Sequence, residues 1–313
     1  MVLKKVWIIP LLTSFLSISA FITSYCIAVS KKHVTGFWPY ISDSGTLPPE
    51  SCIFGQLLNL SAVFFAITAY LRHRQLIEYY WHHLKQKDGN WRNYCTIYLW
   101  FGYFSAFGVS LIGNFQEMNF VIIHYIGALL AFGCGLVYTW AQTIFSYRMR
   151  PRLARAIVPH CRLFLCCLST ALFINVGIFG TILGQQPKDW LNCDQLYKWT
   201  PDSPHYVEHT IATCSEWLLA ICFEFYILTF VIEFRSASCH APKLKLNLDT
   251  LYENHQFNAD TADKSNLTHT ECNNINGCNN GRTISIFIPI DFKNNINDLC
   301  CNSDNSNREL IFK

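Results

Sequence analysis

The amino-acid sequence predicts an all-α integral membrane protein with six transmembrane helices, and three observations support this. Hydrophobic residues make up 51% of the 313 residues and charged residues only 14%, with a mean hydropathy of +0.19. Long stretches carry no formal charge, beginning with the 25 residues between Lys5 and Lys31. These stretches are apolar nearly all round, whereas helices of a soluble bundle keep a polar face. A helix of about 20 apolar residues spans the hydrocarbon layer and satisfies its own backbone hydrogen bonds.

The first span follows two lysines, as a secretory signal would, but its apolar run is too long and lacks a clear cleavage site. We therefore expect a retained helix. Charged residues bound the other spans: Glu50 and Arg72, Arg92 and Glu117, Glu117 and Arg148, Arg162 and Lys188, and Glu208 and Arg235. The predicted spans lie near residues 6–29, 53–71, 94–115, 119–145, 163–183 and 210–232. Because the third and fourth are separated by only a few residues, we expect them to form a tight hairpin.

The distribution of basic residues predicts that both termini are cytoplasmic. If the N-terminus is cytoplasmic, the two cytoplasmic loops carry ten basic residues and the three opposite loops carry four. The ten are Arg72, Arg74, Lys85, Lys87, Arg92, Arg148, Arg150, Arg152, Arg155 and Arg162, and the four are Lys31, Lys32, Lys188 and Lys198. This asymmetry follows the positive-inside rule.

The chain divides into a six-helix transmembrane domain, residues 1–235, and a cytoplasmic tail, residues 236–313. Fifteen asparagines follow Leu246, with few large apolar residues among them. Such a composition buries too little apolar surface to offset the entropy lost on ordering. The sequence therefore predicts a disordered, Asn-rich tail.

Two acidic residues within the sixth span, Glu216 and Glu224, are candidates for an intramembrane polar site. Ionisable groups in a bilayer usually face a cavity or a partner because their desolvation is costly. Eight residues correspond to about 80° of rotation, so one face of the helix can present both. We expect them to face spans three and four, where His124, Asn114 and Gln116 are possible partners. The alternative is an interhelical hydrogen-bond network that serves packing alone.

Basic side chains and cysteines supply further candidate sites. Arg148, Arg150, Arg152 and Arg155 follow the fourth span and could contact anionic lipids, although topology determination alone also explains them. Cys52 and Cys193 are the two cysteines expected near outer loops. They could form a disulfide in an oxidising lumen, or remain free thiols.

The sequence contains no motif that predicts an enzyme, a cofactor or a metal site. It has no Gly-rich phosphate loop, no HExxH and no defensible Ser-His-Asp arrangement, and the tail cysteines lack zinc-site spacing. The net charge of +3 is too small to suggest a nucleic-acid partner. The outer loop, residues 36–51, could bind a cation or a lipid headgroup, or form a compact cap over the bundle.

Several strings of residues resemble the damage-regulated autophagy modulator (DRAM) family. They are FWPYISDSGTLPPESCIFGQLLN in the first outer loop, SAFGVSLIGNFQE in the third span, HYIGALLAFGCGLVYTWAQTIFSYRMRP in the fourth and HYVEHTIATCSEWLLAICFEFYILTF in the sixth. Within them, residues 38–43 match the family's PYISD-type loop, 114–116 its NFQ, 124–127 its HxxG, and Glu216 with Trp217 its EW pair. The resemblance covers roughly residues 5–235. Glu224 departs from the apolar residue expected at its position.

The resemblance implies a non-enzymatic, multi-pass protein of lysosomal or endolysosomal membranes that promotes autophagy. It implies no agreed catalytic residue. Membrane lipids, and cytoplasmic proteins bound through the basic loops or the tail, are the expected partners. The wider group includes regulators of membrane lipid composition, so the alternative is a transporter or lipid regulator, and the alternative location is the plasma membrane.

Overall fold

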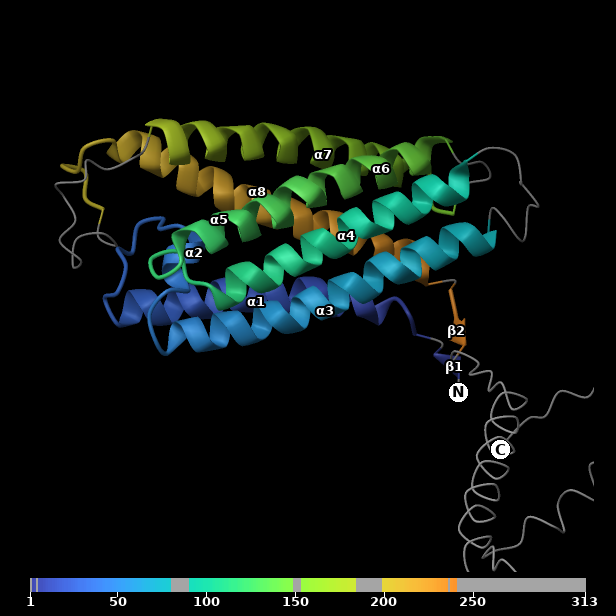
Figure 1. Cartoon of the computed structure of the whole chain (residues 1–313), viewed down its shortest axis with the longest axis horizontal. Helices are drawn as coiled ribbons and strands as arrows, with labels where there is room; N and C mark the ends of the chain where they lie inside the picture. The colour runs from blue at the N-terminus through green and yellow to red at the C-terminus, as the bar shows by residue number, and fades with distance from the viewer. Residues whose placement is uncertain are drawn as a thin grey trace, which may run out of the picture. The chain divides into compact units, whose positions relative to one another are not determined.

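The computed structural model describes residues 2–3, 5–79, 90–148, 153–183, 199–235 and 237–240. Within them, six helical segments are long and apolar enough to cross a membrane, as predicted (Figure 1). They are α1 (Ile8–Ser30), α3 (Glu50–Leu76), α4 (Trp91–Asn114), α5 (Val121–Ala128) continued by η2 (Leu129–Cys134) and α6 (Gly135–Arg148), α7 (Ile157–Asn175) continued by η3 (Val176–Leu183), and α8 (Tyr206–Phe234). A short helix, α2 (Ile41–Ser44), lies between α1 and α3.

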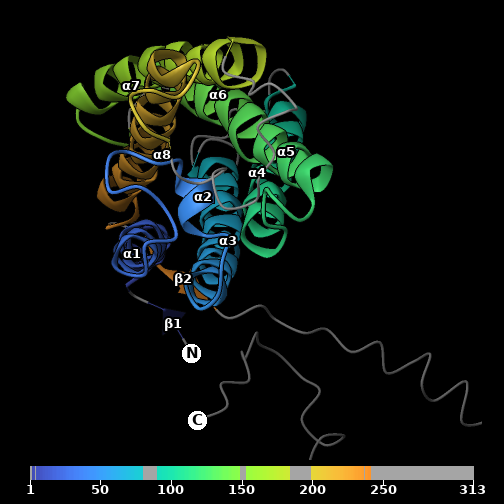
Figure 2. The same cartoon turned by 90° about the vertical axis from the view of Figure 1, so that its left-hand side faces the viewer.

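The spans form a closed ring in chain order. Each span packs against the next, and α8 returns to pack against α1. In the end-on view, α2 lies in front of the centre of the ring (Figure 2). This closure brings side chains from the first and last spans together at the axis.

The outer and inner surfaces of the bundle differ as expected for a protein solvated by lipid. Large apolar side chains face outward, including Phe15, Ile122 and Phe164, which are 64%, 76% and 66% exposed. Small polar side chains such as Ser17 and Thr68 are buried between helices. Because lipid tails are as apolar as the outward residues, tight packing and interhelical hydrogen bonds hold the helices together.

The hairpin of α4 and α5 packs unusually closely at Gly108. A Cβ atom on this residue would lie 2.3 Å from the backbone nitrogen of Ala131 and 2.6 Å from the carbonyl oxygen of Gly127. Ser105 Oγ also donates to the Ala131 carbonyl, at 2.7 Å. The close approach of spans three and four therefore depends on the absence of a side chain at Gly108.

Two helices extend past a boundary residue that is a buried arginine. The second span continues through Arg72 to Leu76 rather than ending near residue 71, and the fifth starts at Ile157 rather than near residue 163. Both arginines are buried, at 2% and 0% exposure. A charge marks the end of a span only when it faces water, and these two face a buried partner.

The two ends of the transmembrane unit meet at one end of the bundle. Strand β1 (Val2–Leu3) pairs antiparallel with β2 (Cys239–His240), at the opposite end of the bundle from α2 (Figure 1). An even number of spans also places both termini on one side. Residues 241–313 lie outside the described residues, and their disorder stays a prediction.

Candidate functional site

The outer loop forms a cap that α8 holds in place. Glu216 Oε2 accepts a hydrogen bond from the backbone N–H of Ile41, at 2.8 Å, and so satisfies one of the free amides at the start of α2. Trp217 Nε1 donates to the carbonyl oxygen of Pro39, at 2.9 Å. The EW pair and the PYISD-type loop, recognised separately in the sequence, are thus two halves of one contact.

A second acidic residue holds the other side of the cap. Ser42 Oγ donates to Glu117 Oε2, at 2.8 Å, from the turn between α4 and α5. Tyr125 Oη donates to the other oxygen of this carboxylate, at 3.3 Å. The cap therefore connects the hairpin of spans three and four to span six.

Asp43, in α2, is the most pH-sensitive part of this cap. Burial, and then the neighbouring carboxylates of Glu117 and Glu216, raise its pKa well above the usual range, against a backbone hydrogen bond at Tyr40 that lowers it. Burial and the same acids raise the pKa of Tyr40 as well. The folded cap therefore favours the protonated form of Asp43.

We expect the purified protein to be more stable at acidic than at neutral pH. The folded-state pKa of Asp43 is raised, so its contribution to stability is fully present below the unfolded value of about 3.9 and is lost as the pH rises through the folded value. Melting temperatures from pH 4 to pH 8 should fall, and the fall should be smaller in Asp43→Asn. An identical pH profile for the variant would contradict this assignment.

Behind the cap, the centre of the ring encloses a cavity of about 100 Å³. Its outer end is lined by Ile41, Ser42, His124 and Glu216, and its inner end by Thr13, Ser17, Ser61 and Glu224. Most of the wall between these ends is apolar, with aromatic side chains from α1, α3 and α8. The cavity is thus polar at two ends and apolar between them.

The structure brings together three of the five residues predicted for the intramembrane site. Glu216, Glu224 and His124 all line the cavity. Asn114 instead bonds Asn59, at 2.8 Å, on an exposed face of α3 and α4. Gln116 accepts from Asn119, at 3.0 Å, within the turn. Inclusion of the two amides in one site was therefore wrong, because helix rotation directs Asn114 toward α3 and Gln116 lies past the end of α4.

The expected pairing of a glutamate with His124 is not formed among the described residues. His124 Nδ1 donates to the carbonyl oxygen of Phe115, at 2.8 Å. Glu216 is engaged with the cap. Glu224 is only 8% exposed, and its Oε2 has no hydrogen-bond partner among the described groups. Of the two span-six glutamates, Glu224 is thus the one with a carboxylate oxygen that lacks a hydrogen-bond donor among the described residues.

We expect Glu216→Ala to loosen the cap and Glu216→Gln to retain it largely. Alanine leaves the Ile41 amide without its acceptor, at a cost of about 1–3 kcal/mol, whereas glutamine still offers an oxygen. Proteolytic sensitivity of the outer loop and the melting temperature measure the effect. Equal loss in both variants would show that the charge, rather than the acceptor, holds α2.

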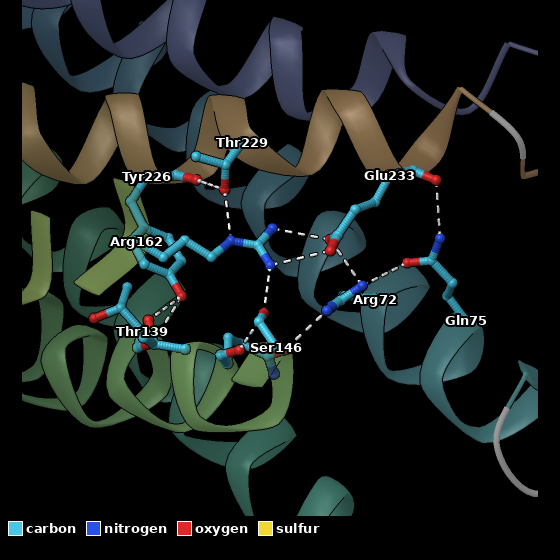
Figure 3. A network of polar contacts seen from close by, with 10 residues as sticks. Arg72, Gln75, Thr139, Ser146, Arg162, Tyr226, Thr229 and Glu233 are labelled. Carbon is cyan, nitrogen blue, oxygen red and sulfur yellow. Dashed lines mark hydrogen bonds and ion pairs between the residues drawn. The ribbon is translucent and has the colours of Figure 1, made fainter. Parts of the chain in front are cut away.

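A second polar cluster lies near the C-terminal end of α8 and involves α3, α6 and α7 (Figure 3). Glu233 of α8 accepts from Arg162 of α7 through both oxygens, at 3.1 and 2.9 Å, and pairs with Arg72 Nη1 of α3, at 2.8 Å. All three side chains are at most 3% exposed. This buried triad joins three spans through one carboxylate.

Neutral groups satisfy the remaining donors of the triad. Arg162 donates to Ser146 Oγ, at 2.7 Å, and to Thr229 Oγ1, at 2.8 Å. Arg72 donates to the side-chain oxygens of Gln142, at 3.2 Å, and Gln75, at 2.9 Å. The network therefore also includes α6.

Sequence reasoning missed this triad because it counted both arginines as loop charges. The available signal was a glutamate near the predicted cytoplasmic end of span six, level with arginines at the same end of spans two and five. Opposite charges at one depth of a bundle favour pairing, since an unpaired one is costly.

The other predicted sites stay predictions. Arg148 and Arg155 are exposed, as a lipid contact requires, whereas Arg150 and Arg152 lie outside the described residues. Cys52 is an exposed free cysteine on α3, and Cys193, its possible disulfide partner, also lies outside them.

Comparison with known proteins identifies the family. Residues 5–237 match the family described as Frag1/DRAM/Sfk1/Cwh43P N-terminal domain. The chain belongs to this family. The match covers all six spans and the cap, so the resemblance seen in the short strings is confirmed and extends through the whole Frag1/DRAM unit.

Relatives within the family are similar over most of their length. The chain is 35% identical over 241 residues to DNA damage-regulated autophagy modulator protein 1 of Homo sapiens, covering 75% of this chain and 94% of the relative. It is 35% identical over 245 residues to the modulator protein 2 of Bos taurus, covering 75% and 86%. It is also 39% identical over 163 residues to the modulator of macroautophagy TMEM150B of Bos taurus, covering 51% and 66%. No solved structure significantly matches this Frag1/DRAM chain.

Proposed function

We propose that this chain is a non-enzymatic protein of the endolysosomal membrane that modulates autophagy. The observation that carries the proposal is similarity across all six spans to relatives named as autophagy modulators, including 94% of the length of the human one. The cap fits an acidic lumen, since the raised pKa of Asp43 makes the folded cap more stable at low pH. Membrane lipids, and cytoplasmic proteins that bind the basic loops or the tail, are the proposed partners.

The ionisable groups described above support a structural rather than a catalytic role. Glu216 holds the cap, Glu233 neutralises two buried arginines, and His124 holds the turn before α5. Side chains that are held by structural hydrogen bonds and ion pairs are poorly placed to transfer protons to a substrate or to react with it. Modulation of autophagy then depends on where the folded protein resides and what it contacts.

The test combines location with function in cells that lack the endogenous protein. A C-terminally tagged chain is imaged against lysosomal and plasma-membrane markers, and autophagic flux is measured with and without inhibition of lysosomal degradation. Lysosomal signal with a change in flux supports the proposal. Plasma-membrane signal with unchanged flux contradicts it. Glu233→Gln serves as the misfolded control and Asp202→Asn, at an exposed residue outside the proposed sites, as the surface control.

A second candidate function is a transporter or a regulator of membrane lipids. The observation that favours it is the central cavity, which contains a buried carboxylate with an unpaired oxygen. Glu224→Gln discriminates between the two functions. If the protein is a scaffold, the folded and correctly located variant should support the same autophagic flux as the native protein. If it is a transporter, the variant should lose transport activity. Glu224 suits this test better than Glu216, which also supports the cap.

A further inference from the structure

The inner end of the central cavity has the features of a ligand site. Glu224 is only 8% exposed. It lines the cavity, and its Oε2 has no hydrogen-bond partner among the described residues. A buried polar atom without a partner costs free energy unless a ligand or water supplies the missing bond. Glu224 Oε2 is therefore an acceptor without a hydrogen-bond donor among the described residues.

No described cation neutralises this carboxylate. The two buried arginines near α8, Arg72 and Arg162, are both paired with Glu233. Glu233 follows Glu224 by nine residues, or about 13 Å along the helix. Glu224 is thus separate from the triad, and its carboxylate, when ionised, has no counter-ion among the described residues.

The hydroxyl groups of Ser14 and Ser17 lie beside Glu224. Ser14 Oγ donates to the backbone oxygen of Glu224, at 3.2 Å, which places α1 directly against α8 at this level. One turn further along α1, Ser17 Oγ lies 2.7 Å from Ser61 Oγ. Because Ser61 donates its proton to the carbonyl oxygen of Thr13, at 2.9 Å, Ser17 must donate to Ser61. The lone pairs of Ser17 then remain available to accept.

The size and walls of the cavity limit the rest of the ligand. At about 100 Å³, it is smaller than the engineered cavity of about 150 Å³ that accepts benzene. A sterol or a whole phospholipid is therefore too large, and a body of about four or five carbons fits. Apolar side chains such as Phe65, Phe223 and Ile227 surround this space.

We propose that the cavity binds a small primary amine. Its ammonium group pairs with Glu224 and Ser17, and its short apolar body occupies the apolar middle of the cavity. An ammonium supplies three donors and one positive charge, so it can donate to Glu224 Oε2 and Ser17 Oγ and also balance the carboxylate. An alcohol supplies one donor and no charge. A quaternary ammonium supplies charge without a donor. The α2 cap closes the outer end of the cavity through Ile41 and Ser42.

This inference deepens the second candidate function, and it is tested by binding alone. The full-length protein is purified in detergent, and its melting temperature is followed during titration with n-butylammonium chloride. n-Butanol controls for solvent and micelle effects, and tetramethylammonium chloride controls for ionic strength and charge. We expect a saturable rise in melting temperature with butylammonium that exceeds the effect of either control.

Variants locate the response within the cavity. Glu224→Gln should weaken butylammonium binding about tenfold or more, because a charge-assisted hydrogen bond is lost. Ala220→Leu fills the cavity while keeping the carboxylate, and it should abolish the response even if Glu224→Gln folds poorly. Glu208→Gln, on the same helix but 36% exposed, should respond like the native protein.

Three outcomes would overturn the site. They are equal stabilisation by butanol and butylammonium, an undiminished response in Glu224→Gln or in Ala220→Leu, and no saturable response in the native protein. The first indicates a cavity that takes any apolar solute, the second indicates binding outside the cavity, and the third indicates a cavity that does not bind the amine. Because the assay uses neither autophagic flux nor transport, its failure leaves the proposed cellular function standing, and a failed flux assay leaves the binding site standing.

Discussion

Glu233→Gln should prevent the protein from reaching its folded, monodisperse state. The substitution leaves Arg72 and Arg162 buried at 2% and 0% exposure without the carboxylate that pairs with both. Removing one partner of a buried ion pair costs about 3–5 kcal/mol, which is a large fraction of the stability of most proteins. Fluorescence-detected size-exclusion chromatography should show loss of the main peak, and the melting temperature of any recovered protein should fall.

A compensated variant separates charge from packing at the triad. Arg72→Met, Arg162→Met and Glu233→Leu together remove all three charges while keeping much of their volume. Buried ion pairs can often be replaced by apolar residues of similar size without loss of stability. We therefore expect the triple variant to recover part of the folded yield that Glu233→Gln loses. If the triple variant is no better than the single one, the triad acts through its neutral hydrogen-bond partners rather than through charge balance.

Gly108→Ala should also strongly destabilise the bundle. The added Cβ would lie 2.3 Å from the Ala131 nitrogen and 2.6 Å from the Gly127 oxygen. Both neighbours are backbone atoms, so the helices themselves must separate. The expected cost is at the upper end of the about 1–3 kcal/mol typical of overpacking, or above it. Thermal unfolding of the purified protein measures the change.

Gly133→Ala is the matched control for this prediction. Gly133 lies in η2, the segment that contains Ala131, but the nearest atom to its added Cβ is a flexible methyl group of Leu129, at 3.4 Å. Alanine is the better helix former by up to about 1 kcal/mol, so this variant should be neutral or slightly more stable. Similar losses in both variants would indicate that helix propensity, and not close approach, decides the effect at Gly108.

Properties that depend on local composition could be predicted from the sequence. The six spans follow from apolar length, and the hairpin of α4 and α5 follows from the short separation between two such runs. The family is readable because the PYISD-type loop and the EW pair are short, contiguous strings. Predictions of these features succeed because hydropathy and motifs are properties of neighbouring residues along one chain segment.

Tertiary structure alone decided which partner each polar side chain met. The sequence placed Glu216 and Glu224 in one candidate site, yet Glu216 holds Ile41 of the cap and Glu224 lines the cavity with an unsatisfied oxygen. By sequence, Arg162 was a loop charge, yet it is buried against Glu233. Hydropathy states how deep a helix lies but not how it is rotated or which helix stands beside it, and those two variables determine whether a charge faces lipid, water, a cavity or an opposite charge.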